Sequence, residues 1–547
     1  MSQHQAFRRT SVPQQVAQQL QTITIPAPTR GIIQNENEAY MQPGGAVICD
    51  NWKPTMRGVS LRGGCIVWCT LPETTPVISA FQYASGNIQK MFAGNATKLY
   101  EITTTTPVLI KSEQTSGNYA ASQLANATGD WMIVVNDAGN PPLRYGPSSG
   151  GGLTWETLST GYTPPAGKPS MITGIPAAGL SYVCKYRNRY FFIETGSMNA
   201  WYLPLNAVGG ALAMIPLSGA ATKGGKLLSC FSWSIDAGDG IDDKIVFMTD
   251  LGELLIFTGS DPSVITSWRQ EGRYEVSPPL GMNAHLAIGG DVLIATVDGI
   301  VPISGAITKD RAELELAAIT RTIKPLWREQ VLDKREYAWT MCKWDEYGGL
   351  FTTFPGGAPG KQLCLATNAA TGAHARFTGW DAMCFVKMAG DAFFGTQTGK
   401  IMQMDRTGYD NGVPYVAVLV GGWEMFQSPS QTVTWRQSRA SFSARAGEPF
   451  VPQLSATTDY VVVLPQPPLV GPDPGLLDLW DQGLWDTSKW DAGTPPPPVV
   501  RNTGWVSIGM TGYSHAPIVQ VSVGQQAKPE VDLISIAATF ERDGVNV

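Results

Sequence analysis

Short apolar runs separated by turn residues dominate the chain from residue 45 to 410. β-Branched and aromatic residues gather in runs of four to eight, as in KLYEITTTTPVLIKS and GDVLIATVDGIVPIS. Between such runs, Asp, Asn or Thr precedes a glycine that can adopt positive φ, at 136–140, 249–253, 297–299 and 396–400. We therefore expect a long series of β-hairpins with turns at these four places.

The length of this hairpin region favours a propeller over a sandwich. About 365 residues, divided by the roughly 40–50 residues of a four-stranded blade, give seven to nine units. Because the repeat is imperfect, we expect six to eight blades. The sequence therefore predicts an all-β protein whose residues 45–410 form a β-propeller.

One segment of this region has the spacing of a helix. Between 308 and 331, apolar residues from Leu314 to Leu326 approach helical spacing, with charges on the remaining face. Pro325 disfavours continuation of a helix. We therefore expect one helix that ends near Lys324.

Residues 1–44 have the composition of an extended N-terminal arm. The segment is polar, rich in glutamine and broken by prolines, so it buries too little apolar surface to fold alone. It is either a disordered terminus or a strap on a neighbouring subunit, where TITIPAP (22–28) would add a strand. Arg8 and Arg9 are the basic candidates for such a contact.

Residues 411–547 predict a smaller C-terminal β domain that contains a long Pro- and Gly-rich loop at 464–500. In this loop Trp480, Trp485 and Trp490 are spaced five apart, and an aspartate follows each one. This period fits neither a strand nor a helix. The tryptophans either tuck against the domain, contact a subunit or fibre, or stack on carbohydrate.

Charge and cysteine content narrow the class of protein. The formal net charge is −6, with 39 basic and 45 acidic residues. This charge argues against a protein that wraps nucleic acid through dense phosphate contacts, whereas a weakly acidic surface would let DNA pass. The eight cysteines are scattered through apolar runs, so we expect buried free thiols and no zinc site. The longest apolar run, 413–422, falls short of the ~20 residues that span a bilayer, and no secretory signal is visible.

Candidate chemistry is sparse, and we expect neither an enzyme nor a cofactor or metal site. Residues 148–155 are similar to a sialidase Asp-box, but Gly150 replaces its aspartate, so a turn is expected. The four aspartates within 234–243 lack the EF-hand order and predict an exposed loop. None of the four histidines lies in an HExxH motif or beside a GxSxG motif. A pair of carboxylates that cleaves glycosides stays an alternative, because the distance between two such groups depends on the tertiary structure.

Two stretches of the chain, 25–64 and 251–304, share residues with one known protein family. The first, 25–64, runs from a PAP-type arm into an entry strand, and Lys53 stands where the family usually has an aromatic residue. Its matching residues are Asp50, Asn51, Trp52, Pro54, Gly58, Leu61, Arg62 and Gly64, whereas Ile48 and Cys49 replace residues that are usually of the leucine type. The second, 251–304, matches at Gly252, Glu253, Gly259, Asp261, Pro262, Trp268, Gly272, Pro278, Gly289, Asp291, Thr296, Gly299 and Pro302. Together the two stretches resemble the tail nozzle, or tail hub, β-propeller family of short-tailed bacteriophages.

The resemblance implies a structural virion protein of a podovirus tail, made in the host cytoplasm. Such a subunit would form a ring, expected to be hexameric, below the portal-adaptor proteins. The ring would extend the DNA channel, retain the genome, dock tail fibres or spikes, and pass genomic DNA without sequence-specific binding. The alternative is a receptor-binding or glycan-depolymerising tail propeller.

Overall fold

The computed structural model is nearly all β, with 52% of residues in strands and 6% in helices. The described residues are 20–137, 139–148, 151–158, 171–175, 179–234, 243–264, 266–309, 313–426, 431–445, 448, 450–471 and 497–542. Within them, no helix has both the length and the apolar character needed to cross a membrane.

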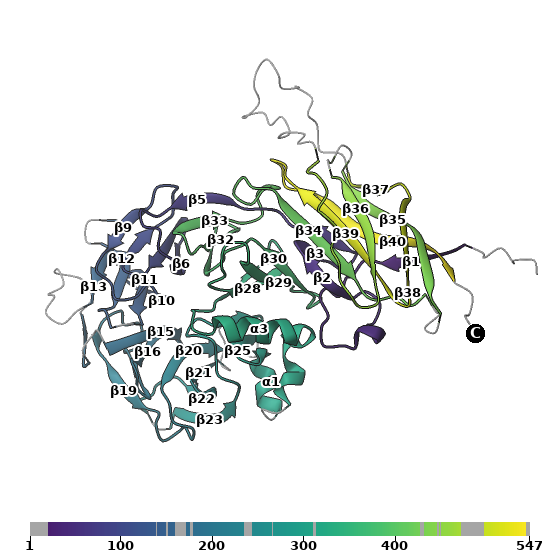
Figure 1. Cartoon of the computed structure of the whole chain (residues 1–547). Coiled ribbons are helices and arrows are strands. Elements are labelled where there is room, and N and C mark those ends of the chain that lie inside the picture. The colour runs from purple at the N-terminus through teal and green to yellow at the C-terminus, as the bar shows by residue number, and fades with distance from the viewer. Residues whose placement is uncertain are drawn as a thin grey trace, which may run out of the picture.

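Antiparallel sheets surround a common centre and form a β-propeller (Figure 1). The described residues make six units of four strands and a further unit of three strands, within the expected six to eight. The first four units are β6–β9 (Val77–Ser85, Ile88–Asn95, Leu99–Glu101, Val108–Lys111), β10–β13 (Tyr119–Asn126, Gly129–Asn136, Leu143–Pro147, Leu153–Thr157), β15, β16, β17 and β19 (Leu180–Tyr186, Arg189–Glu194, Asn199–Tyr202, Ala213–Pro216) and β20–β23 (Leu227–Trp233, Lys244–Thr249, Glu253–Gly259, Trp268–Glu275). The others are β24–β26 (His285–Ile288, Asp291–Thr296, Gly299–Pro302), β27–β30 (Met341–Trp344, Gly349–Phe354, Leu363–Asn368, His374–Thr378) and β31–β33 with β5 (Cys384–Met388, Asp391–Gly395, Lys400–Gln403, Ile66–Thr70).

Two features hold the ring of units together. β5 comes from the start of the chain and pairs with β33 near the end of the propeller, which closes the ring. Neighbouring units bury apolar faces against each other; Val77 and Met91 of the first unit, for example, pack with Val386 and Phe393 of the last. Closure pairs the two ends of the ring, and a propeller of such units leaves only short, protected edges that could pair with other chains.

All four predicted hairpin turns are confirmed. They join β11 to β12, β21 to β22, β25 to β26 and β32 to β33, and each contains a glycine with positive φ. The Asp-box-like segment spans the connection between the paired strands β12 and β13 and includes the first three residues of β13; its residues Ser149 and Gly150 lie outside the described residues. Of the aspartates in the predicted loop at 234–243, Asp236, Asp239 and Asp242 lie outside the described residues.

The predicted single helix is wrong. The chain instead forms four short pieces: α1 (Ile303–Thr308), α2 (Leu314–Ala317), the 3₁₀ helix η3 (Ile319–Ile323) and α3 (Lys324–Lys334). Pro325 lies in the first turn of α3, where the missing N–H has no intrahelical partner to lose and the fixed φ suits a helix. The proline therefore starts a helix where we expected it to end one.

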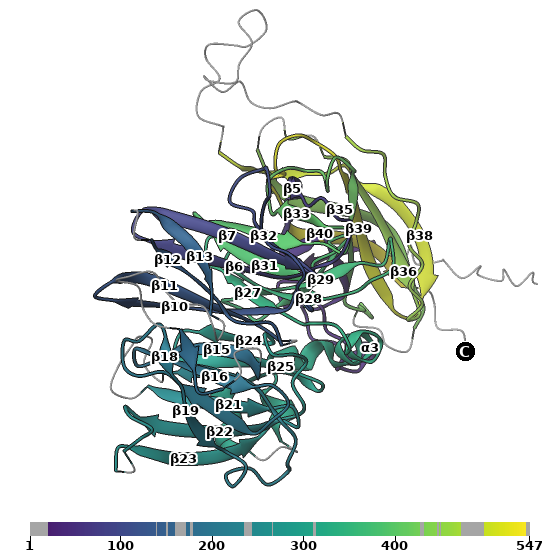
Figure 2. The same cartoon turned by 90° about the vertical axis from the view of Figure 1, so that its left-hand side faces the viewer.

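Two further sheets form the C-terminal part beside the ring (Figure 2). One has the order β3-β4-β40-β35-β37, with β1 on β40 and β38 on β35; the other continues from β30 through β2, β34, β39 and β36. The new strands are β1 (Gln21–Pro26), β2 (Ala46–Asp50), β3 (Trp52–Pro54), β4 (Val59–Leu61), β34 (Tyr415–Gly421), β35 (Val433–Ala444), β36 (Pro452–Thr458), β37 (Val499–Asn502), β38 (Val506–Gly512), β39 (His515–Val523) and β40 (Val531–Arg542). Leu419 and Val519 of one sheet share a core with Phe442 and Leu533 of the other.

Strand pairing runs across the boundaries expected at residues 44 and 410. β1 lies in the expected arm but pairs along its whole length with β40 of the same chain. β2 and β4 lie in the expected propeller but hydrogen-bond to the C-terminal strands β34 and β40, and β3 joins the same sheet through β4. The two ends of the chain therefore build the C-terminal part together.

Candidate functional site: the Arg62 junction

The interface residues expected from sequence lie outside the described residues. This applies to Arg8 and Arg9 of the arm and to Trp480, Trp485 and Trp490 of the loop. The residues of the first resembling stretch, in contrast, converge at the place where the propeller meets the C-terminal sheets.

Arg62, which directly follows β4, is the centre of this junction. Its side chain has no exposed surface and forms a two-pronged ion pair with Asp410, at 2.9 Å from Nη1 to Oδ1 and 2.6 Å from Nη2 to Oδ2. Nε donates to Asn51 Oδ1 at 2.8 Å, Nη1 to the Gly63 carbonyl and Nη2 to the Thr378 carbonyl, each at 3.1 Å. All five guanidinium N–H groups are therefore satisfied.

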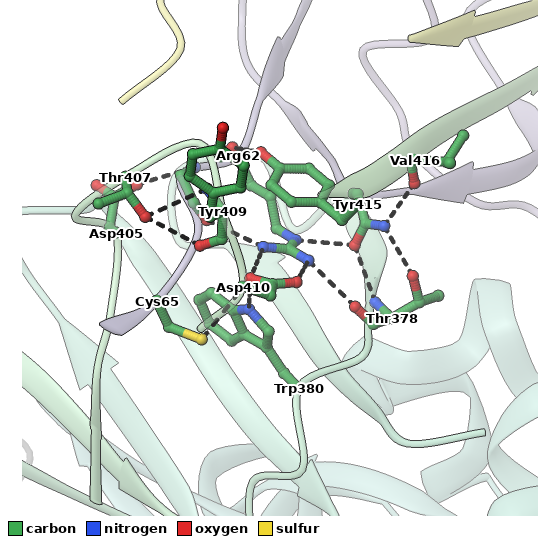
Figure 3. Close-up of polar contacts among 12 residues, drawn as sticks. Arg62, Cys65, Thr378, Trp380, Asp405, Thr407, Tyr409, Asp410, Tyr415 and Val416 are labelled. Carbon is green, nitrogen blue, oxygen red and sulfur yellow. Dashed lines mark hydrogen bonds and ion pairs between the residues drawn. The ribbon is translucent and has the colours of Figure 1, made fainter. Parts of the chain in front are cut away.

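Aromatic rings enclose the same guanidinium group (Figure 3). Its central carbon lies 4.0 Å from the centre of the Tyr415 ring and 5.0 Å from that of Trp380. Tyr415 also donates its hydroxyl proton to the Arg62 carbonyl, and Trp380 Nε1 donates to Asp410 Oδ1 at 3.1 Å. Burial disfavours the charge on Arg62, but Asp410 outweighs it and raises the pKa of Arg62, so the guanidinium stays charged.

Asn51 extends the network into three segments of the chain. Its backbone has a φ of 62°, a conformation that asparagine tolerates better than most residues. Nδ2 donates to Thr378 Oγ1 and to the Val416 carbonyl, both at 2.7 Å, and Oδ1 accepts from the Thr378 amide as well as from Arg62. One side chain thereby joins the entry strands, blade strand β30 and strand β34.

Two glycines of the same stretch are required by close backbone approach. A Cβ on Gly58 would lie 2.2 Å from the Leu533 carbonyl oxygen, and one on Gly64 would lie 1.9 Å from the Tyr409 carbonyl oxygen. Both distances are far shorter than any real contact. The glycines let the entry segment lie directly against β40 and the segment 405–410.

The remaining charged groups at the junction are also held in pairs. Asp50 accepts two hydrogen bonds from Arg376, at 2.6 and 2.8 Å. Lys53 lies 3.6 Å above the Tyr347 ring and donates to the Tyr347 carbonyl. The junction also contains the Cys65 thiol. Burial and the charge of Asp410 raise the pKa of this thiol, so the thiol stays protonated and is a poor nucleophile.

The second resembling stretch has structural roles inside the fourth blade. Glu253 is fully buried and accepts from the amides of Thr222 and Lys223, at 2.9 and 3.0 Å. Burial opposes the charge, but these hydrogen bonds lower the pKa of Glu253, so its carboxylate holds the preceding loop in place. Trp268 stacks on Phe191 and Phe257, which joins the fourth blade to the third.

The Arg62 junction can hold the propeller and the C-terminal sheets together. The polar atoms of Arg62, Asn51 and Asp410 are used in the hydrogen bonds and the ion pair that make this connection. Within the described part of the chain, no group of three or more His, Cys, Asp or Glu side chains is placed to hold a metal ion. His374 is fully buried and His285 is partly buried, and desolvation lowers the pKa of each to about 4. They are therefore neutral near pH 7.

Sequence reasoning identified one half of the junction and missed the other. Asn51 and Arg62 stand in the first resembling stretch, whereas Thr378, Trp380, Asp410 and Tyr415 lie more than 300 positions away from Arg62. A lone aspartate in the turn segment GYDNG (408–412) carries no local signal of an ion pair. Only the fold brings these residues together.

Comparisons with known proteins found matches of low similarity among solved structures. No family model matches the chain, and no curated protein matches it. Among solved structures, Saccharomyces cerevisiae Sqt1 is 10% identical over 63% of this chain and 99% of its own, with a TM-score of 0.35. YCF48 bound to a D1 peptide is 11% identical over 61% and 94%, and the designed protein Ika8 is 10% identical over 62% and 99%; both have a TM-score of 0.33. At these scores the likenesses carry no argument about function.

Proposed function

We propose that this chain is a structural virion protein of a short-tailed phage tail, of the nozzle or hub type. Copies form a ring, hexameric in our proposal, below the portal-adaptor proteins. The ring extends the DNA channel, retains the genome and docks tail fibres or spikes. Its work is mechanical, and genomic DNA passes through without sequence-specific binding.

The Arg62 junction is the observation that carries this proposal. The residues that give the chain its resemblance to the nozzle family, Asn51, Gly58, Arg62 and Gly64 among them, are those that fasten the propeller to the C-terminal sheets. A ring component that is loaded by a packaged genome needs its two parts held at a fixed angle. A buried ion pair with every donor satisfied provides such a rigid connection.

The edges of the C-terminal sheet support a ring of copies. Among the described residues, β1 hydrogen-bonds only to β40 and β38 only to β35, so each strand is paired along one side. Because neighbouring strands in the order β1-β40-β35-β38 are all antiparallel, β1 and β38 run in opposite directions. A second copy placed head to tail would continue the antiparallel alternation, and head-to-tail contacts close into rings.

Electron microscopy of negatively stained protein tests the proposal. The purified chain is imaged alone and after mixing with the portal and adaptor proteins of the same virus. Closed rings with a central hole about as wide as duplex DNA, bound to the portal-adaptor complex, are the expected result. A monomer that never joins the complex, or that degrades host surface polysaccharide in solution, contradicts the proposal and favours the receptor-binding or depolymerising alternative.

Substitution of the loop tryptophans tests the docking part of the proposal. Replacing Trp480, Trp485 and Trp490 by alanine should leave the melting temperature unchanged and reduce binding of the ring to neighbouring subunits or fibres. Leu332→Ala is the matched control, because Leu332 is an apolar residue of α3 that is 79% exposed. Equal binding by the triple variant and the control would remove the loop from the interface.

A further inference from the structure

Two buried cysteines from neighbouring blades have their sulfur atoms in contact. Cys184 lies on β15 of the third unit and Cys230 on β20 of the fourth, and their Sγ atoms are 2.9 Å apart. This separation is shorter than the normal contact of two non-bonded sulfur atoms. All eight cysteines are described and free, and this is the pair among them that the structure places in contact.

We propose that Cys184 and Cys230 are an oxidisable dithiol that forms a disulfide between the two blades. A disulfide bond is ~2.05 Å long, so closing the pair requires an approach of about 0.9 Å. Both residues belong to one apolar cluster, and the strands β15 and β20 lie against each other, so the backbones are already neighbours. This inference stands independently of the proposed phage function.

The oxidant is a two-electron acceptor such as hydrogen peroxide. Peroxide transfers one oxygen to the first thiol and gives a sulfenic acid and one water. The second sulfur then attacks the first; the S–O bond breaks, and the hydroxyl leaves with the thiol proton as a second water. The two thiols together lose two protons and two electrons, which the peroxide takes up as it becomes two molecules of water.

The surroundings assign an order to these two steps. Cys184 is 8% exposed, whereas Cys230 is fully buried, so oxidant reaches Cys184 first and Cys230 completes the bond. Burial and the neighbouring Cys184 raise the pKa of Cys230 well above its usual value. Cys230 is therefore slow to react in the closed fold, and the pair stays reduced in a reducing cytosol.

The bond would lock the ring of blades at one place. It joins two residues 46 positions apart and closes a loop that contains the rest of the third unit. Cross-links of such loops stabilise proteins, chiefly because they restrict the unfolded chain. A protein made reduced and later exposed to oxidising surroundings would become more resistant to unfolding without any change of fold.

Thiol mapping of the full-length protein tests this proposal. Protein purified with reductant is freed of it, exposed to hydrogen peroxide, alkylated under denaturing conditions and digested. The expected result is a peptide pair linked through Cys184 and Cys230, a fall in free thiols from eight to six, and a higher melting temperature that reductant reverses. The variants C184S and C230S should show neither the linked peptide nor the rise in melting temperature.

A control variant and a second condition separate this proposal from general thiol oxidation. Cys342→Ser leaves the pair intact and should behave as the parent protein does, with one thiol fewer. A parallel sample contains urea below the unfolding transition, so that slow opening of the blades does not hide the reaction. If Cys184 and Cys230 stay fully alkylated in both samples, or if Cys184 bonds to a cysteine other than Cys230, the proposal is overturned.

Discussion

Arg62 is charged, completely buried and paired with a residue from a distant segment. Its replacement should therefore lower the free energy of unfolding strongly. Arg62→Met leaves the Asp410 carboxylate without its cation inside the junction. Removal of one member of a buried ion pair typically destabilises a protein by about 3–5 kcal/mol. We therefore expect a loss of this size in the free energy of unfolding, measured by urea titration and followed by tryptophan fluorescence.

Arg406→Met is the matched control for this substitution. Arg406 also pairs with an aspartate, Asp391, at 2.8 Å, but 44% of its side chain is exposed. Exposed ion pairs contribute about 0–1 kcal/mol, because water screens both charges. Losses of similar size in the two variants would show that the junction does not depend on the buried charge.

The buried histidines predict a loss of stability at mildly acidic pH. His285 and His374 have a pKa lowered to about 4 by burial, against 6.5 in an unfolded chain. The unfolded state therefore binds more protons between these values, so stability is full above pH 6.5 and falls as the pH drops towards 4. Each histidine contributes about 3 kcal/mol to this loss at its limit.

Unfolding free energies measured between pH 7.5 and pH 5 check the histidine effect by comparing the parent protein with a His285 variant, because any carboxylate that titrates in this range is common to both. His285→Phe retains a ring that can stack on Phe231, which lies 4.4 Å from the histidine ring, and it removes one titrating group. Its free energy of unfolding should fall less steeply between these two pH values. An unchanged slope would mean that His285 does not titrate as its burial requires.

At the scale of elements, the helical segment shows how position decides the effect of a proline. Pro325 lies in the first turn of α3, so Pro325→Ala should change the free energy of unfolding by less than about 0.5 kcal/mol. Glu329→Pro introduces the same residue in the helix interior, at an exposed position, and should cost about 3 kcal/mol or more. Urea titration of both variants measures the difference, and equal losses would contradict the placement of α3.

The N-terminal segment gives a prediction at the scale of the whole molecule. Deletion of residues 1–19 leaves β1 in place on β40, so the melting temperature should stay unchanged. Deletion of residues 1–26 also removes β1 and the buried side chain of Ile25, so it should lower the melting temperature and prevent ring formation. Thermal melting and electron microscopy of the two deletion variants distinguish the role of β1 from that of residues 1–19. Rings formed by the variant that lacks residues 1–26 would exclude β1 as a contact between ring subunits.

Local sequence determined the repeated parts of this protein. Asp, Asn or Thr before a glycine that can adopt positive φ placed four hairpin turns correctly, and cysteines within apolar runs were correctly expected to be buried and free. These features depend on residues that are close along the chain, so their patterns can be read without the fold. The length of the hairpin region then limited the architecture to a propeller.

Tertiary structure alone decided how the ends of the chain meet. The pairing of β1 and β4 with β40 and of β2 with β34, and the contact of Arg62 with Asp410 across 348 positions, leave no periodic signal in the sequence. The start of α3 at Lys324 likewise depends on packing, because Leu326 and Trp327 are buried there. Sequence by itself therefore determined the turns and the β class. Burial and ion pairing stabilise contacts between residues however far apart they lie along the chain, so only the tertiary structure decided the closure of the ring and the Arg62 junction.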